Sequence, residues 1–100
     1  MLKIPYLPWM IKKVIHSNNF KKSYRKFILK NKKFKESFDK KWNIFIDNPE
    51  HPSLKNHYLK EDLKGLKAIY IEYNMRLIYK EVSKDTIIVY DIGTHDEVYK

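Results

Sequence analysis

His57 and His95 are the two side chains in this sequence best suited to moving protons in a reaction. An imidazole has an unperturbed pKa of about 6.5, so near neutral pH it can both accept and donate a proton. Such a pair could cleave RNA if one histidine removed the proton of a 2′-hydroxyl and the other protonated the departing 5′-oxygen. The residues lie far apart in the sequence, so this hypothesis requires the fold to bring them together. The alternative is two unrelated polar histidines.

Arg76 is the residue best suited to hold a phosphate. It is the only arginine after Arg25, and a guanidinium can form two parallel hydrogen bonds to a phosphate, which a lysine cannot. It shares one face of an expected strand with Lys80, because alternate strand residues point to the same side. The alternative is an exposed arginine paired with Glu72 on the neighbouring strand. Tyr99 could stack on a base or bind a phosphate, although anchoring the last strand is a commoner role for such a tyrosine.

The remaining polar residues do not form a metal-binding pattern. The chain has no cysteine, which excludes disulfides and thiolate metal sites. It also lacks a His-x-x-x-His motif and clustered carboxylates. His16 and His51 are most simply read as surface loop residues. We therefore expect chemistry that uses neither a metal nor another cofactor.

Positive charge is concentrated in the first part of the chain. Residues 1–41 hold thirteen Lys and Arg against two Asp and Glu, whereas residues 42–100 hold eight against ten. Such a bias indicates a polyanionic partner. The alternative is a lysine-rich composition from an AT-rich genome, but the second part shares the genome and not the charge. The cations that we expect to bind RNA are Lys12, Lys13, Lys21, Lys22, Arg25 and Lys26.

The apolar pattern predicts a short first strand over residues 10–15 and then two helices. Ser17, Asn18 or Asn19 can cap the first helix, whose apolar stripe recurs at helical spacing. A second stripe starts at Phe34 and includes either Trp42 or the aliphatic stem of Lys41. This helix should end before Asn48-Pro49, because the residue ahead of a proline disfavours the helical conformation. The first stripe consists of Phe20, Tyr24, Phe27 and Ile28.

The second part of the chain predicts a sheet. Residues 50–65 are typical of turns with a short edge strand, and residues 67–73, 75–82 and 86–92 are rich in β-branched and aromatic side chains. The joints between these three strands are too short for a crossover helix, so the strands should form an antiparallel meander. We expect an α+β domain in which the helices cover one face of the sheet and leave the other free for binding.

The chain length and its apolar runs indicate one cytoplasmic domain. A chain of 100 residues is the size of a single domain. We expect the domain to span residues 10–100, with residues 1–9 as an N-terminal extension. The first nine residues have too short an apolar run and too many prolines for a signal peptide. No run approaches the roughly 20 apolar residues of a membrane span, so no membrane partner is expected.

A set of short motifs carries a family resemblance. They are Asn48-Pro49, His57-Tyr58-Leu59, Lys64-Gly65, Arg76-Leu77-Ile78-Tyr79 and Gly93-Thr94-His95 with Tyr99. With these motifs in this order, the chain resembles the RelE-like toxins of bacterial type II toxin–antitoxin modules, most closely their YafQ-like branch. The likeness spans about residues 11–99.

The resemblance implies a fold, an activity and partners. The fold would be a two-helix hairpin packed on a curved, mostly antiparallel sheet of four to five strands, with substrate on the concave face. The activity would be that of a metal-independent endoribonuclease that cleaves mRNA, commonly on the ribosome. A cognate antitoxin protein would neutralise it, and the basic face of residues 12–41 offers a surface for that protein or for ribosomal RNA.

The resemblance also implies roles for individual residues. His57 and His95 match the catalytic histidines of the branch, one as base and the other as acid, and Tyr99 matches its C-terminal aromatic residue. Arg76 matches an arginine that contacts the phosphate and would stabilise charge on the phosphorane. Tyr70 and Asn74 stand where the branch carries a further histidine and an aspartate, so Asn74 cannot act as a base, and Tyr70 could only donate a proton or a hydrogen bond. They are supporting candidates, together with Lys80.

Two other functions remain open. A protein of the same fold could lack nuclease activity, either as a ParE-like gyrase poison or as an inactive remnant that only binds an antitoxin. ParE-like proteins lack the Gly-Thr-His ending, so His95 counts against the first of these. A general RNA-binding module is supported by charge alone.

Overall fold

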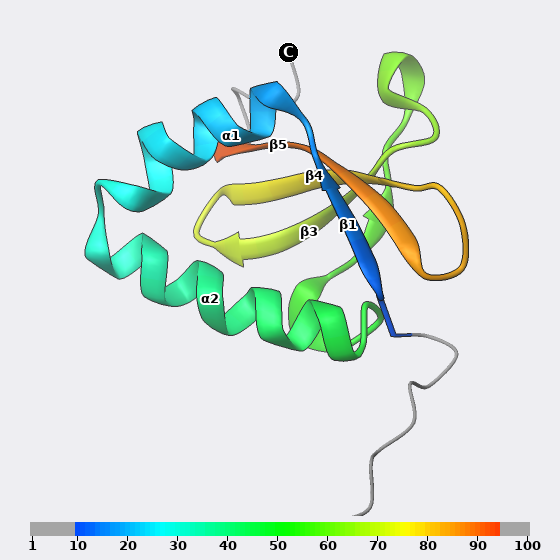
Figure 1. Ribbon diagram of the computed structural model, residues 1–100, viewed down its shortest axis with the longest axis horizontal. Helices are drawn as coiled ribbons and strands as arrows, with labels where there is room; N and C mark the ends of the chain where they lie inside the picture. The colour runs from blue at the N-terminus through cyan, green and yellow to red at the C-terminus, as the bar shows by residue number, and fades with distance from the viewer. Residues whose placement is uncertain (1–9, 95–100) are drawn as a thin grey trace, which may run out of the picture.

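The computed structural model describes residues 10–94, and Figure 1 shows their path. A short strand is followed by a helical hairpin and then by the remaining strands. The order is β1 (Lys13–His16), α1 (Asn18–Ser23), the π-helical η1 (Tyr24–Leu29), α2 (Lys32–Asp47), the 3-10 turn η2 (Pro52–Leu54), β2 (His57–Tyr58), the 3-10 turn η3 (Glu61–Leu63), β3 (Lys67–Glu72), β4 (Met75–Glu81) and β5 (Thr86–Thr94).

The described strands form one five-stranded sheet in the order β1-β5-β4-β3-β2. Strands β2 to β5 are joined by antiparallel pairings, whereas β1 runs parallel to β5. The predicted α+β fold and the antiparallel meander are confirmed. The first strand starts and ends later than predicted. It pairs Lys13 with Thr86 and His16 with Val89, so its bounds follow from β5, which the local sequence does not reveal.

The ends of the helices follow from local capping. The hydroxyl of Ser17 accepts a hydrogen bond from the amide of Phe20 at 3.0 Å, and the side chain of Asn31 accepts one from the amide of Phe34 at 3.1 Å. Both satisfy amides that the first turn of a helix leaves without a partner. Helix α2 ends at Asp47, as predicted from Asn48-Pro49.

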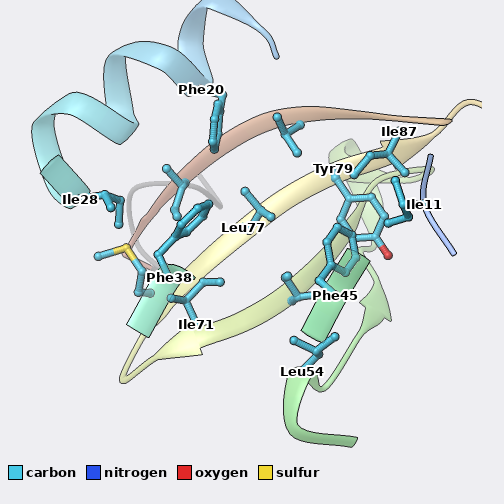
Figure 2. Close-up of a cluster of buried hydrophobic side chains, with 14 residues drawn as sticks. Ile11, Phe20, Ile28, Phe38, Phe45, Leu54, Ile71, Leu77, Tyr79 and Ile87 are labelled. Carbon is cyan, nitrogen blue, oxygen red and sulfur yellow. The ribbon is translucent and has the colours of Figure 1, made fainter. Parts of the chain in front are cut away.

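The core lies between the helices and one face of the sheet (Figure 2). Trp42 packs against this core and stacks on Phe38, with ring centres 5.7 Å apart. Trp42, rather than the stem of Lys41, therefore belongs to the inner stripe of α2. Ring contacts run without a break from the end of β1, across the helices, to β4, through His16, Phe20, Tyr24, Phe38, Trp42, Phe45 and Tyr79.

The opposite face of the sheet is less open than the sequence predicts. Met75, Leu77 and Tyr79 point into the core, so Arg76, Ile78 and Lys80 point to the other side. Ile78 is nevertheless only 3% exposed, and Ala68 on the neighbouring strand is fully buried. The segment after β2 lies beside this face, because its side chains share a hollow with Arg76. A binding site on this face is therefore a bounded hollow instead of an open sheet.

Candidate active site

His57 and Arg76 line one surface hollow, although they belong to different strands. His57 begins β2 and Arg76 lies in β4, with β3 between the two strands. The hollow has a volume of about 470 Å³. The fold thus brings together two of the residues that the sequence predicts for catalysis. The rest of the lining comes from the segment that follows His57, namely Tyr58, Leu59, Lys60, Glu61 and Leu63.

The imidazole of His57 is exposed and is held at one of its two nitrogens. Its Nδ1 lies 2.9 Å from the carbonyl oxygen of Lys55. A carbonyl oxygen can only accept a hydrogen bond, so Nδ1 carries the proton in this contact. In the neutral ring the lone pair is then on Nε2, which is the nitrogen able to take a proton from a substrate.

The backbone of Lys55 makes this contact possible. Lys55 ends η2 in the left-handed conformation, with φ of 49° and ψ of 44°, which residues other than glycine adopt only at some cost. This turn leads the chain into β2 and sets the carbonyl of Lys55 against the ring of His57. Sequence reasoning could not detect it, because neither Gly nor Asn marks the position.

The guanidinium of Arg76 is anchored through one nitrogen. Its Nη1 donates hydrogen bonds to the carbonyl oxygens of Tyr73 at 2.8 Å and Met75 at 3.1 Å. The alternative pairing with Glu72 is wrong, because the Glu72 carboxylate accepts from the Ser37 hydroxyl at 2.7 Å and no ion pair within residues 10–94 includes Arg76. Nε and Nη2 keep the two-pronged geometry that suits a phosphate.

Tyr70 lies next to Arg76 across the β3–β4 pair. The guanidinium carbon of Arg76 is 5.0 Å from the centre of the Tyr70 ring, and the amide of Tyr73 donates to the Tyr70 hydroxyl at 3.1 Å. Two lysines that sequence reasoning left out of the site, Lys41 and Lys55, also lie over this ring. Lys41 lies at the end of the basic segment 1–41, but no sequence signal pairs it with Tyr70, and Lys55 belongs to no motif or charge run.

Comparison with known proteins assigns the family. The sequence matches the profile described as "Bacterial toxin of type II toxin-antitoxin system, YafQ" over residues 12–100. The chain belongs to the YafQ toxin family. The prediction from the sequence is thereby confirmed, including the type II toxin–antitoxin class. No curated protein sequence matches the chain.

Solved structures share the fold of this YafQ-family toxin at low sequence identity. YafQ from E. coli strain BL21(DE3) is 24% identical with a TM-score of 0.72, and the match covers 87% of this chain and 97% of that one. The toxin of the E. coli DinJ-YafQ complex is also 24% identical, with a TM-score of 0.69 and the same coverage. A YoeB/ParE toxin from Agrobacterium tumefaciens is 18% identical, with a TM-score of 0.70 over 84% of this chain and 99% of that one.

The last strand of the toxin ends beside Arg76. In the β4–β5 pair, Gly93 lies opposite Arg76 and Thr94 lies opposite Met75. His95 follows Thr94 in the sequence, but His95 and Tyr99 lie outside the described residues, so the roles assigned to them stay predictions.

The three supporting candidates have different positions in the toxin. Tyr70 contacts Arg76. Asn74 is exposed in the turn between β3 and β4, and Lys80 is exposed on β4. Neither Asn74 nor Lys80 lines the hollow of His57 and Arg76, so only Tyr70 is joined to it by a contact with a lining residue.

The cations predicted to bind RNA do not line the hollow. Strands β1 and β2 form opposite edges of the sheet, and the helical cations are exposed on α1 and η1. Their binding of RNA stays a prediction, and any such contact would lie apart from the hollow. The six residues are Lys12 and Lys13 at β1, Lys21 and Lys22 on α1, and Arg25 and Lys26 on η1.

A buried polar network holds the chain just ahead of His57. The side-chain amide of Asn56 donates to the carbonyl oxygen of Pro49 at 2.9 Å and to the Tyr79 hydroxyl at 2.6 Å. Tyr79 is 1% exposed, and burial raises its pKa to about 12. Since Tyr79 is fixed in the core, this network ties the start of β2 to β4.

Neither a metal cluster nor a membrane-spanning helix occurs in residues 10–94. No three His, Cys, Asp or Glu side chains group there in a way that could hold a metal ion. No helix in the same range has the length and apolarity to cross a membrane.

Proposed function

We propose that this toxin is an endoribonuclease that cleaves mRNA by attack of a 2′-hydroxyl on the adjacent phosphate. The observation that carries the proposal is the shared hollow of His57 and Arg76. It combines an imidazole whose Nε2 can take a proton with a guanidinium whose Nε and Nη2 can bind a phosphate. Membership in the YafQ family supports the same activity.

The proposed reaction balances without a co-reactant. Nε2 of His57 takes the proton of the 2′-hydroxyl, and the 2′-oxygen forms a bond to phosphorus. The bond from phosphorus to the 5′-oxygen breaks, and an acid gives that oxygen a proton. One product ends in a 2′,3′-cyclic phosphate and the other begins with a 5′-hydroxyl. Arg76 stabilises the negative charge that builds up on the phosphorane.

His95 is the candidate for the acid, with Tyr99 as the aromatic residue beside the substrate. The assignment follows from the resemblance to the family. The end of β5 supports it, because Gly93 lies opposite Arg76 and Thr94, the residue before His95, lies opposite Met75. His57 is preferred as the base because Lys55 holds the Nδ1 proton and leaves the Nε2 lone pair for the substrate.

The proposed partners are a cognate antitoxin and mRNA, the latter on the ribosome in the cytoplasm. YafQ of E. coli has been solved in a complex with DinJ, which supports an antitoxin partner. A hollow of about 570 Å³ between the helices has aromatic walls and a basic rim that includes Lys21 and Arg25. This surface suits an acidic and apolar antitoxin segment. Copurification with the product of the neighbouring gene tests the partner.

The experiment that tests the function compares alanine variants of the two histidines. We expect His57→Ala and His95→Ala each to abolish growth arrest and RNA cleavage upon induction, because each removes one proton-transfer group. Primer extension on RNA from induced cells measures cleavage, and the termini are analysed for 2′,3′-cyclic phosphate. His16→Ala is the matched control. This variant should remain fully active, since His16 lies in β1, at the edge of the sheet opposite β2 and His57.

Two results would reject the proposal. Full cleavage by His57→Ala with a normal thermal unfolding midpoint would remove His57 from catalysis. Growth arrest without RNA cleavage by the wild-type toxin would favour the gyrase-poison alternative, and inhibition of DNA supercoiling in vitro would then identify it.

A further inference from the structure

Three cations from three separate elements surround the ring of Tyr70. Lys41 Nζ lies 5.4 Å from the ring centre and Lys55 Nζ lies 5.2 Å from it. The guanidinium carbon of Arg76 lies 5.0 Å from the same centre. Each cation is attracted to the π-face of the ring, but the cations repel one another. We call Lys41, Lys55, Tyr70 and Arg76 the cation cluster.

Among the described residues 10–94, no carboxylate forms an ion pair with Lys41, Lys55 or Arg76. Uncompensated positive charges held together at one place create a potential that attracts an anion. The cluster is thus prepared for a negatively charged ligand that can contact several cations at once.

Several of its members are fixed before any ligand binds. Lys41 Nζ donates to the carbonyl oxygen of Ser53 at 3.3 Å, and Arg76 Nη1 donates to that of Tyr73 at 2.8 Å. The Tyr70 hydroxyl accepts from the amide of Tyr73 at 3.1 Å. Such preorganisation lowers the entropy cost of binding.

The cluster adjoins the candidate active site at two points. Arg76 belongs to both the cluster and the hollow. Lys55 places its ammonium group over Tyr70 while its carbonyl oxygen holds the imidazole of His57. If the scissile phosphate of an RNA strand lies between His57 and Arg76, a neighbouring phosphate of the same RNA would therefore lie close to the cation cluster.

We propose that Lys41, Lys55 and Tyr70 form a second phosphate subsite, which binds the phosphodiester next to the one that is cleaved. The ligand is the backbone of single-stranded RNA, and the inference rests on the proposed ribonuclease function. The two lysines contact phosphate oxygens, and the Tyr70 ring provides an aromatic surface of the kind on which unpaired bases stack. The subsite contributes to substrate binding and does not take part in proton transfer.

The test removes the two lysine charges and measures RNA binding without cleavage. The probe is a fluorescein-labelled 2′-O-methyl oligoribonucleotide of mixed sequence, which has no 2′-hydroxyl to attack. We expect Lys41→Gln with Lys55→Gln to raise the Kd about 10-fold in fluorescence anisotropy. The slope of log K against log salt should become shallower by about 0.7 for each lost phosphate contact. Lys41→Arg with Lys55→Arg should keep wild-type binding.

A matched control separates local from overall charge. The double variant Lys30→Gln with Lys40→Gln removes the same charge from exposed positions outside the cluster. It should change the Kd for the RNA probe by less than about 2-fold. With cleavable RNA, the cluster variant should show a KM raised about 10-fold and kcat nearly unchanged, since uniform binding is lost. Thermal unfolding checks that all variants are folded.

Three results would overturn the subsite. If the cluster variant and the control variant lost RNA affinity equally, only the net charge of the protein would matter. A fall in kcat with unchanged KM would place the lysines in the chemical step. Unchanged RNA binding with weaker antitoxin binding would assign the cluster to the protein partner. If the wild-type toxin neither binds nor cleaves RNA, the proposed function itself fails, which is a distinct outcome.

Discussion

The two side chains proposed for proton transfer and phosphate binding are each anchored to the backbone through one nitrogen. His57 is held at Nδ1 by the carbonyl of Lys55, and Arg76 is held at Nη1 by two carbonyl oxygens. In both residues the remaining nitrogens can reach a substrate. Anchoring of this kind reduces the conformational freedom lost upon binding and keeps the reacting atoms in place.

The anchored fork of Arg76 leads to a prediction for Arg76→Lys. Lysine keeps the charge but cannot hold both carbonyl oxygens and at the same time offer two parallel donors to a phosphate. We expect it to lower kcat nearly as much as Arg76→Ala, by about 10²-fold, a typical loss for an electrostatic group in a transition state. Single-turnover cleavage of RNA measures the effect. Turnover of the lysine variant at the wild-type rate would mean that charge alone suffices.

At the scale of elements, the position of β2 depends on β4, which is separated from it in the sheet by β3. Strand β2 has two residues and pairs with β3 only at Ala68 and Lys67. Its placement is therefore supported by the side chain of Asn56, which links Pro49 to Tyr79 of β4. At the same end of the sheet, Lys67 of β3 pairs with Glu81 at 2.7 Å and with Glu50 at 3.5 Å.

The Asn56 link leads to a prediction for Asn56→Ala. The change leaves the Tyr79 hydroxyl and the Pro49 carbonyl without their donor, which should lower the free energy of unfolding by about 1–3 kcal/mol. Ribonuclease activity should fall as well, because β2 carries His57. Urea denaturation and cleavage assays measure the two effects. Asn43→Ala on the exposed side of α2 is the control. Additive losses in Asn56→Ala with Tyr79→Phe would argue against direct coupling of the two side chains.

For the whole molecule, positive charge is divided between two regions. The cation cluster joins α2, the end of η2, β3 and β4, whereas the other basic residues belong to β1, α1 and η1. Strand β1 and strand β2, which follows Lys55 in the chain, lie at opposite edges of the sheet. A substrate and a second polyanionic or acidic partner can therefore approach different sides of the same small protein.

The stability of the whole domain should fall in alkaline solution. Burial raises the pKa of Tyr79 to about 12, although the hydrogen bond from Asn56 opposes the rise. Burial lowers the pKa of Lys67, but its hydrogen bond to Glu81 and nearby charges raise it overall. Because the pKa values of Tyr79 and Lys67 are higher in the folded protein than in the unfolded chain, the domain keeps its full stability below the unfolded-state pKa of each group. It loses stability as the pH rises through the folded-state pKa.

We expect Tyr79 alone to account for a loss on the order of 2 kcal/mol of unfolding free energy between pH 10 and pH 12. Urea denaturation at several pH values across this range measures the loss. Tyr79→Phe should make the dependence on pH shallower, whereas Tyr90→Phe, at an exposed position, should not. The same slope in wild type and Tyr79→Phe would contradict the assignment.

The sequence by itself determined the features of this toxin that depend on neighbouring residues. A cap among Ser17, Asn18 and Asn19 starts the first helix, Pro49 follows the end of the second, and the period of two marks the strands. Such signals are local, because caps, prolines and side-chain alternation act over a few residues. The ordered motifs also identified the family.

Only the tertiary structure decided which distant residues meet. The parallel pairing of β1 with β5, the shared hollow of His57 and Arg76, and the gathering of Lys41 and Lys55 at Tyr70 all join segments that are separate in the sequence. These contacts depend on strand order, register and side-chain packing across the whole domain. No local pattern encodes them, because each results from the free energy of the complete fold.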